Sequence, residues 1–199
     1  MPWFRGSAVL GFRGSRFSDM ALFRKGLSPH QTALAMVGAK TGSSVLVMGA
    51  SDTTLAAEVA LVTGISGRTL VVDPDPNSEK RVETAGGQAG SLMEFLRAPL
   101  GMLPLDSDTF DVTVLPGFAL DAPHERTTVV AEAFRVTRPG GRIVIVSRER
   151  RPGVFGAIAP KLPTLEPDAA TSLLSNAGAK AVRHLASQNG VAYYEGRKA

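Results

Sequence analysis

Cysteine is absent from the 199 residues, and so are long apolar runs. Without cysteine the chain has no disulfide framework and no thiolate metal site. No apolar run approaches the roughly 18 residues that a membrane-spanning helix needs. Arg5, Arg13 and Arg16 interrupt the apolar residues at the start, so we expect no signal peptide. The expected location is the cytoplasm, with attachment to the periphery of a membrane or a complex left open.

Histidine is scarce, and the sequence lacks the short motifs of several common enzyme classes. There is no Gly-x-Ser-x-Gly elbow, no phosphate-binding P-loop and no HExxH. The spacing of His, Asp and Glu suggests no metal site. Apolar residues make up 44% of the chain, which suits one globular domain with a sizeable core.

Positive charge is concentrated at the start of the chain. Residues 1–40 contain six Lys and Arg side chains and one acid, Asp19, although the net charge of the whole chain is only +4. The rest is close to neutral, so nucleic-acid binding by the main body is not expected. Residues 1–27 also repeat a short pattern, at Phe4–Ser7 and Phe12–Ser15. This basic, aromatic N-terminal arm has three open interpretations: a loosely docked tail, an anchor on a partner protein complex, or a contact with an anionic membrane surface or RNA.

From Ser28 onward, apolar runs alternate with helical patterns, which indicates βαβ units and a mostly parallel sheet. Strands are predicted at residues 44–48, 69–72, 92–96, 110–115, 142–147, 180–186 and 191–195, and helices at 28–40, 53–63, 79–89, 125–137 and 166–177. We expect residues 139–141, Pro-Gly-Gly, to stop the fourth helix. Asn189-Gly190 predicts a hairpin between the last two strands. In such sheets ligands bind beyond the carboxyl ends of the strands, so the residues there are the candidates for a site.

The first strand runs into a sharp turn, because residues 45–56 read VLVMGASDTTLA. A nucleotide-binding turn usually has three glycines. Only Gly49 is present here, and Ser51 and Thr53 occupy the other two positions. The segment alone fits a cofactor turn or a plain strand-to-helix turn with Ser51 or Asp52 as the N-cap.

An acid, Asp73, closes the second predicted strand, 24 residues after Gly49. An acid at about this separation can accept hydrogen bonds from the hydroxyls of a ribose. It can equally open the turn that continues through Pro74 and Asp75. The spacing leaves both interpretations open.

Two later blocks read LPLDSDTFDV at residues 103–112 and EAFRVTRPGGRI at residues 132–143. They resemble the class I S-adenosylmethionine-dependent methyltransferases, in particular the small-molecule group called type 11. The entry to the third strand at residues 90–95 is also similar. The resemblance covers residues 29–199, so we expect residues 28–199 to form a methyltransferase-like, Rossmann-type domain.

The resemblance implies an α/β fold with a doubly wound, mostly parallel sheet of seven strands. It implies the strand order 3-2-1-4-5-7-6, with the last strand antiparallel, in a three-layer α/β/α arrangement. It also implies an S-adenosylmethionine site at the ends of strands one to three. Matched position by position, the cofactor-binding residues are expected to be Gly49, Ala50, Ser51, Asp52, Asp73, Pro74, Pro99, Leu100 and Pro116.

The match departs from the family at positions that usually hold the cofactor. Val47 replaces an acid near the amino group of the cofactor, and Pro99 replaces an acid that would bond the adenine amino group. Ser51 and Thr53 replace glycines, and residues 116–118 replace the usual polar opening of the substrate loop. Each missing charge-assisted hydrogen bond is worth roughly 1.5–3 kcal/mol, so losing both acids lowers affinity on the order of 10² to 10⁴. The resemblance therefore implies a weakened cofactor site.

Catalytic groups cannot be identified from the sequence, because methyl transfer mainly needs positioning and only sometimes a general base. His124, after the fourth strand, is a weak candidate for such a base, and residues 123–126 fit a solvated helix start equally well. Arg148, Arg150 and Arg151 follow the fifth strand. They either face an acidic substrate or partner or form a solvated loop.

Two functions therefore compete. The first is an S-adenosylmethionine-dependent methyltransferase that acts on a small molecule with a partly degenerate cofactor site. The alternative is a catalytically inactive subunit of the same fold that docks onto a partner complex through residues 1–27. An RNA methyltransferase is a third interpretation, which the near-neutral charge of the main body disfavours.

Overall fold

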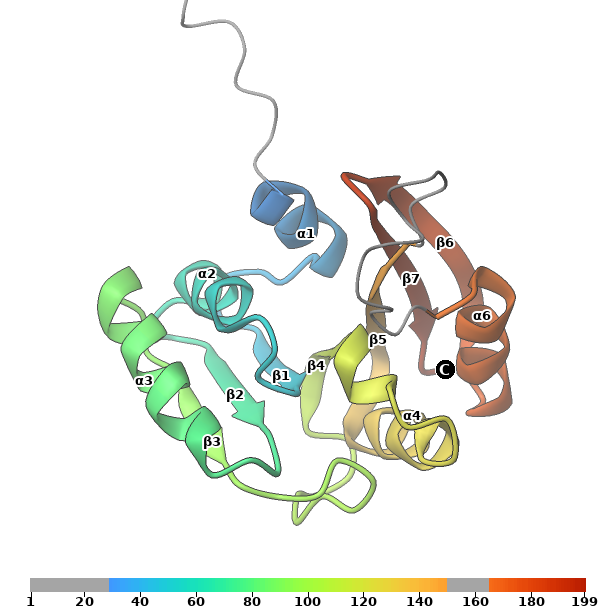
Figure 1. Cartoon of the computed structure of the whole chain (residues 1–199), viewed down its shortest axis with the longest axis horizontal. Helices are drawn as coiled ribbons and strands as arrows, with labels where there is room; N and C mark the ends of the chain where they lie inside the picture. Colours follow the sequence, from blue (N-terminus) through green and yellow to red (C-terminus); the bar gives the residue numbers. More distant parts are fainter. Residues whose placement is uncertain (1–28, 150–164) are drawn as a thin grey trace, which may run out of the picture.

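The structure is a computed structural model that describes residues 29–149 and 165–199 (Figure 1). The predicted arm at residues 1–27 lies outside these ranges, as do Arg150 and Arg151. The strands are β1 (Ser44–Met48), β2 (Arg68–Val72), β3 (Glu94–Leu96), β4 (Phe110–Pro116), β5 (Thr137–Arg148), β6 (Lys180–Gln188) and β7 (Val191–Arg197). The helices are α1 (Pro29–Val37), α2 (Thr53–Thr63), α3 (Asn77–Ala89), α4 (Arg126–Val136) and α6 (Pro167–Asn176), with a 3₁₀ helix η1 (Gly117–Leu120).

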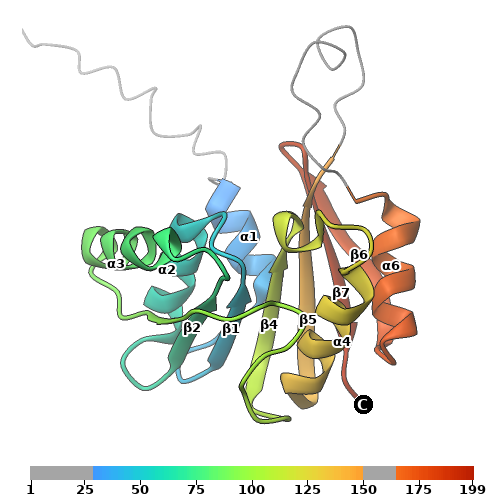
Figure 2. The ribbon, with the colours of Figure 1, turned by 60° about the horizontal axis from the view of Figure 1, so that its bottom comes forward.

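The strands form one seven-stranded sheet in the order β3-β2-β1-β4-β5-β7-β6. Neighbours from β3 to β5 pair in parallel, whereas β7 is antiparallel to both β5 and β6. The predicted α/β fold, strand order and antiparallel last strand are therefore confirmed. Figure 2 shows β2, β1, β4 and β5 side by side in the middle of the molecule.

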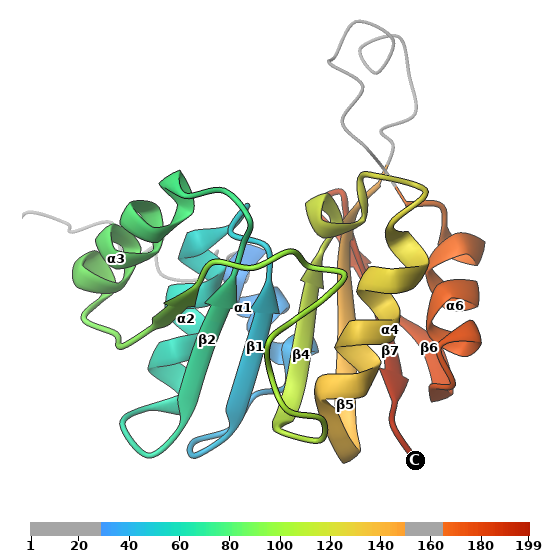
Figure 3. The same ribbon diagram turned by 90° about the horizontal axis from the view of Figure 1, so that it is seen from below.

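Helices cover both faces of the sheet, which gives the expected three layers. In Figure 3, α4 lies in front of the sheet, and α1 and α2 lie behind it. Alternate residues of β1 enter different cores: Leu46 and Met48 pack on the side of α4 and α6, while Val45 and Val47 pack on the side of α1 to α3. None of the helices in the described ranges combines the length and the apolarity that a membrane span needs.

One boundary prediction was wrong. We expected residues 139–141 to stop a helix and a strand to begin at residue 142, but α4 ends at Val136 and β5 begins at Thr137. The buried Thr137 hydroxyl is 2.7 Å from the hydroxyl of Thr113 on β4, which holds the start of β5 against the sheet. A Cβ on Gly141 would lie 2.9 Å from the Asp111 carbonyl oxygen, so the glycine permits close approach of the two strands where their register shifts.

Other predicted ends move by a few residues. The third strand begins at Glu94 instead of residue 92, because residues 91–93 make no ladder with β2. The hairpin between β6 and β7 turns at Asn189 and Gly190, as predicted, with φ of 55° and 76°. Positive φ at both positions belongs to the type I′ turn, which suits the twist of paired strands.

A buried carboxylate joins the three strands at the β6 edge of the sheet. Glu195 on β7 is fully buried and contacts Arg142 on β5, Arg183 on β6 and Arg197 on its own strand, at 2.8, 2.8 and 3.4 Å. Burial lowers the pKa of Arg142, and the nearby Glu195 charge partly offsets this effect. Because one acid faces three cations, we infer that Glu195 is needed to keep Arg142 buried.

Candidate functional site

The turn after β1 is the first part of the candidate site. Gly49 is buried and has a φ of +109°, a backbone conformation that side-chain-bearing residues rarely adopt. Its N–H donates to the Val72 carbonyl oxygen at 2.7 Å, which binds the turn to the end of β2. A Cβ placed on Gly49 would meet only Ala119 Cβ within 4 Å, at 3.6 Å. The turn therefore needs glycine for its backbone angle and leaves space beside it.

Asp73 at the end of β2 holds the same turn with its side chain. The Ala50 N–H donates to Asp73 Oδ2 at 2.7 Å, and the Asp75 N–H donates to Oδ1 at 2.8 Å. The Asp73 carboxylate thus stabilises the turn that follows β2 and also connects this turn to the loop after β1 by hydrogen bonds. An ionised carboxylate accepts about four hydrogen bonds, so each oxygen keeps one acceptor position for a ligand.

The residues after Ala50 begin α2 and line a pocket. Asp52 is the N-cap of α2, and its Oδ1 accepts from the Leu55 N–H at 2.9 Å. Ser51 and Asp52 are exposed and form part of the pocket wall. Ser51 is therefore an exposed residue of the pocket wall and is not buried in the crevice.

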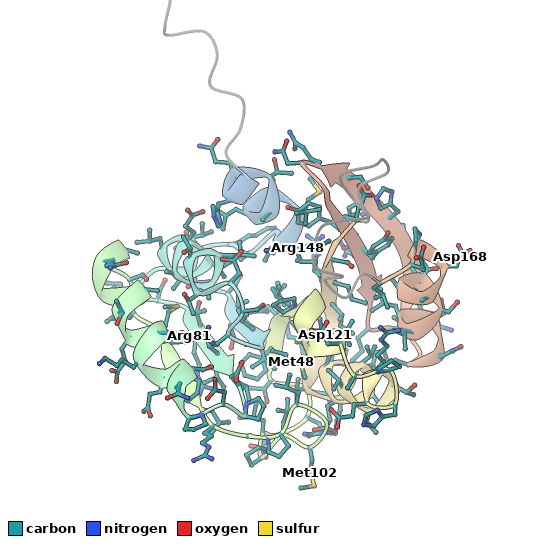
Figure 4. All side chains as sticks on the ribbon, in the orientation of Figure 1. Met48, Arg81, Met102, Asp121, Arg148 and Asp168 are labelled. Carbon is teal, nitrogen blue, oxygen red and sulfur yellow. The ribbon has the colours of Figure 1, made fainter. Side chains whose placement is uncertain are left out.

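This pocket has a volume of about 440 Å³ and lies at the carboxyl ends of β4 and β5. Its lining comes from five parts of the chain: α1, the start of α2, the end of β4, the end of β5, and β7. Pro116 is the last residue of β4 and Gly117 the first of η1, and Arg148, labelled in Figure 4, comes from the end of β5. Asp73 does not line it, so the pocket adjoins the Asp73 end of the site without containing it.

Tyr193 on β7 brings a phenol to the pocket wall. The residue is almost fully buried, at 2% exposure. Burial raises the pKa of Tyr193, and the negative charge of Asp52 raises it further. The hydroxyl therefore stays protonated at neutral pH and can donate a hydrogen bond to a ligand.

The expected adenine end of the site lies on the loop between β3 and β4. Pro74 is exposed, and its carbonyl oxygen accepts from Arg97 Nε at 3.4 Å. Pro99 is exposed, whereas Leu100 is half-buried against the core on the α4 side. Neither residue presents a carboxylate there.

The two blocks that carry the family resemblance hold this loop in place. Glu132 Oε2 accepts from the Leu103 N–H at 2.8 Å, and Arg135 donates to the Leu103 and Leu105 carbonyl oxygens at 3.1 and 2.8 Å. Glu132 and Arg135 also pair with each other at 2.8 Å. The hydrogen bond from Arg135 is the main reason that the pKa of Glu132 is lowered. The two blocks therefore have a structural role, because their side chains hold the loop between β3 and β4 in place beside the site.

A carboxylate oxygen without a hydrogen-bond partner among the described residues lies just after η1. Asp121 Oδ1 is buried and makes no hydrogen bond among the described residues. Burial raises the pKa of Asp121, and the charge of Arg126 partly counteracts this shift. Figure 4 labels Asp121 beside the end of the central strands. A buried acceptor of this kind is costly unless a ligand or a proton satisfies it.

The three histidines occupy different environments. His124, the candidate from the sequence, is 81% exposed with its Nε2 3.5 Å from Glu125, and it does not line the pocket. His184 is exposed and bonds Ser187 at 2.9 Å. His30, which sequence reasoning passed over, lines the pocket from the first turn of α1. The helix predicted at residues 28–40 includes this turn, but no sequence pattern showed which other elements α1 packs against.

In residues 29–149 and 165–199, no three His, Asp or Glu side chains gather closely enough to hold an ion.

The model of the family described as "Methyltransferase domain" matches residues 46–145, about half of the chain. A demethylmenaquinone methyltransferase of Lactococcus lactis is 33% identical over 116 residues, which cover 55% of this chain and 44% of that protein. A demethylmenaquinone methyltransferase of Bacillus subtilis is 32% identical over 129 residues, with coverages of 62% and 52%. The chain thus spans about half the length of these curated relatives.

Solved structures share the fold at lower identity. A crystal structure of an S-adenosylmethionine-dependent methyltransferase from Aquifex aeolicus matches with a TM-score of 0.69 and 18% identity, covering 86% of this chain and 90% of that chain.

Proposed function

The chain belongs to the class I S-adenosylmethionine-dependent methyltransferases, and we propose that it binds S-adenosylmethionine and methylates a small molecule. The observation that carries this proposal is the Asp73 carboxylate, which joins the ends of β1 and β2 and keeps acceptor capacity on both oxygens. Two ribose hydroxyls would satisfy that capacity. When bound, S-adenosylmethionine supplies an electrophilic methyl group.

The described residues fit most of this ligand. Asp73 would hold the ribose, and the space beside Gly49 lets a ligand approach the backbone. Ser51 and Asp52 would lie near the amino-acid end, because they line the pocket next to that turn. At the adenine end, Leu100 offers backbone groups and a half-buried apolar side chain, but Pro99 offers no acid.

The weakened affinity expected from the sequence also stays part of the proposal. Val47, which replaces a family acid, is 3% exposed and packs in the core on the α1 side, so it offers the ligand nothing polar. Two missing carboxylates at positions 47 and 99 favour binding in the micromolar range or weaker rather than tight binding.

A small molecule is the acceptor class that best suits the pocket. Its volume of about 440 Å³ falls within the range of roughly 300–1,000 Å³ that is common for small-ligand sites. The relatives named above methylate demethylmenaquinone according to their names, so a ring-containing acceptor of that general type is the one to test first.

The proposal is tested by calorimetry with S-adenosylhomocysteine, the demethylated product, on the full chain. We expect micromolar binding to the wild-type protein and loss of binding in Asp73→Ala. No heat at about 1 mM ligand, where binding is worth roughly 4 kcal/mol, refutes the proposal.

A further inference from the structure

His30 stands between the pocket and a carboxylate. It is in the first turn of α1 and forms part of the pocket wall. Its Nδ1 lies 4.0 Å from Oε2 of Glu58 on α2, and both side chains are 31% exposed. Nδ1 is thus the ring nitrogen next to the acid, and when its N–H points toward Glu58, Nε2 is the nitrogen that can accept a proton. This order, ligand then imidazole then carboxylate, is the arrangement of a positioned general base.

The other titratable groups around His30 are less suited to take a proton. On α2, the Asp52 carboxylate already accepts from the Leu55 N–H as the helix cap. On β7, Tyr193 stays protonated because burial and Asp52 both raise its pKa. On β5, Arg148 carries a permanent positive charge. Imidazole is the side chain that most readily gains and loses a proton near neutral pH.

These neighbours also define which acceptor the pocket suits. Arg148 supplies positive charge and Tyr193 supplies a hydroxyl donor, and both features stabilise a negatively charged oxygen. A phenol-like or enol-like hydroxyl ionises far more easily than an aliphatic alcohol, since a phenol such as tyrosine has a pKa of ~10. The pocket therefore favours an acceptor with an acidic hydroxyl on an unsaturated ring or chain.

We propose that His30, positioned by Glu58, accepts the proton of an acidic hydroxyl on the acceptor bound in this pocket. The acceptor O–H bond breaks with its electron pair left on oxygen, and the proton bonds to His30 Nε2. The Glu58 carboxylate stabilises the resulting imidazolium, so Glu58 is a positioning residue. The inference rests on the proposed function, because it assigns this pocket to the methyl acceptor.

The test uses 4-nitrophenol as a probe, since its anion absorbs visible light and its neutral form does not. The full-chain protein is titrated with the probe at a series of pH values, with and without S-adenosylhomocysteine. We expect the bound probe to ionise at a pH at least one unit below that of the free probe. His30→Gln should abolish this shift, Glu58→Gln should reduce it, and His124→Gln should leave it unchanged as the matched control.

Several outcomes overturn the inference. They are a wild-type protein that binds no probe, a wild-type protein that binds it without a shift in ionisation, and a His30→Gln variant that retains the shift. If His30→Gln fails to fold, Glu58→Gln carries the test, and a full wild-type shift in that variant also overturns the inference.

Calorimetry with S-adenosylhomocysteine on the same proteins separates this inference from the proposed function. If the wild-type protein binds the nucleoside but does not ionise the probe, only the assignment of His30 fails. If the wild-type protein does not bind the nucleoside, the proposed function fails. If His30→Gln loses nucleoside binding, His30 serves the methyl donor and the inference is wrong.

Discussion

Replacing Asp73 with Asn keeps the size of the side chain and removes its charge. The carboxylate accepts from two backbone N–H groups, and the amide retains only one acceptor oxygen. One charged hydrogen bond to a loop is therefore lost, which should lower the free energy of unfolding by roughly 1.5–3 kcal/mol. The proposed hydrogen bonding to the ribose should weaken by a similar free energy, so the affinity for S-adenosylhomocysteine should fall about 10- to 150-fold.

The matched control is Asp75→Asn, because it makes the same change of charge two residues away. Asp75 is exposed, and its Oδ1 accepts locally from Asn77. We expect calorimetry to show near wild-type affinity for this variant. The reasoning is refuted if Asp73→Asn binds as well as the wild-type protein, or if the two variants lose affinity equally, which would indicate a general effect of charge.

Three further predictions concern stability and are measured by urea unfolding. Gly49→Ala should lower the free energy of unfolding by about 1–3 kcal/mol, because the φ of Gly49 is +109°. Gly87→Ala, in helix α3 with open space around it, should raise the free energy of unfolding by roughly 0.5–1 kcal/mol. Equal effects of the two substitutions would contradict the strain argument. Glu195→Gln should lower the free energy of unfolding by roughly 3–5 kcal/mol, because it leaves arginines around a buried neutral group. Glu94→Gln, in an exposed ion pair, should lower it by less than about 1 kcal/mol. A small loss at position 195 would show that the charge of Glu195 is not needed for stability. The raised pKa of Asp121 means that the folded state holds its proton more tightly than the unfolded state, so wild-type stability should fall, relative to Asp121→Asn, as the pH rises above about 4; parallel pH profiles would exclude this contribution.

The sequence predicted the sheet and the contact between its first two strand ends well. The apolar run at residues 44–48 and the helix at residues 53–63 match β1 and α2 at both ends, because burial on both faces and a capping acid are local signals. Asp73 was identified from its position in the sequence, 24 residues after Gly49. The two interpretations that the sequence left open, a turn opener and a ligand acid, are compatible, since the two carboxylate oxygens serve different N–H groups.

Other features depend on contacts between distant residues, which local patterns do not report. Pro139 and its glycines look like a helix stop, yet they lie within β5, where Gly141 lets the strand pack against the Asp111 carbonyl. His30 reaches the pocket only because α1 packs beside α2 and the end of β5, and His124 looked favourable only because it follows β4. The tertiary structure was therefore needed to find the residues of the pocket, whereas the proposed ribose-binding acid could be predicted from the sequence alone.

The most direct test of the central claim, that Asp73 joins two loops into one ribose site, is the NMR response of backbone amides to S-adenosylhomocysteine. Saturable binding should shift the amide signals of Gly49, Ala50 and Asp75 together and leave that of Arg197, at the far end of β7, unchanged. Saturable binding that leaves Ala50 and Asp75 unmoved would contradict the claim.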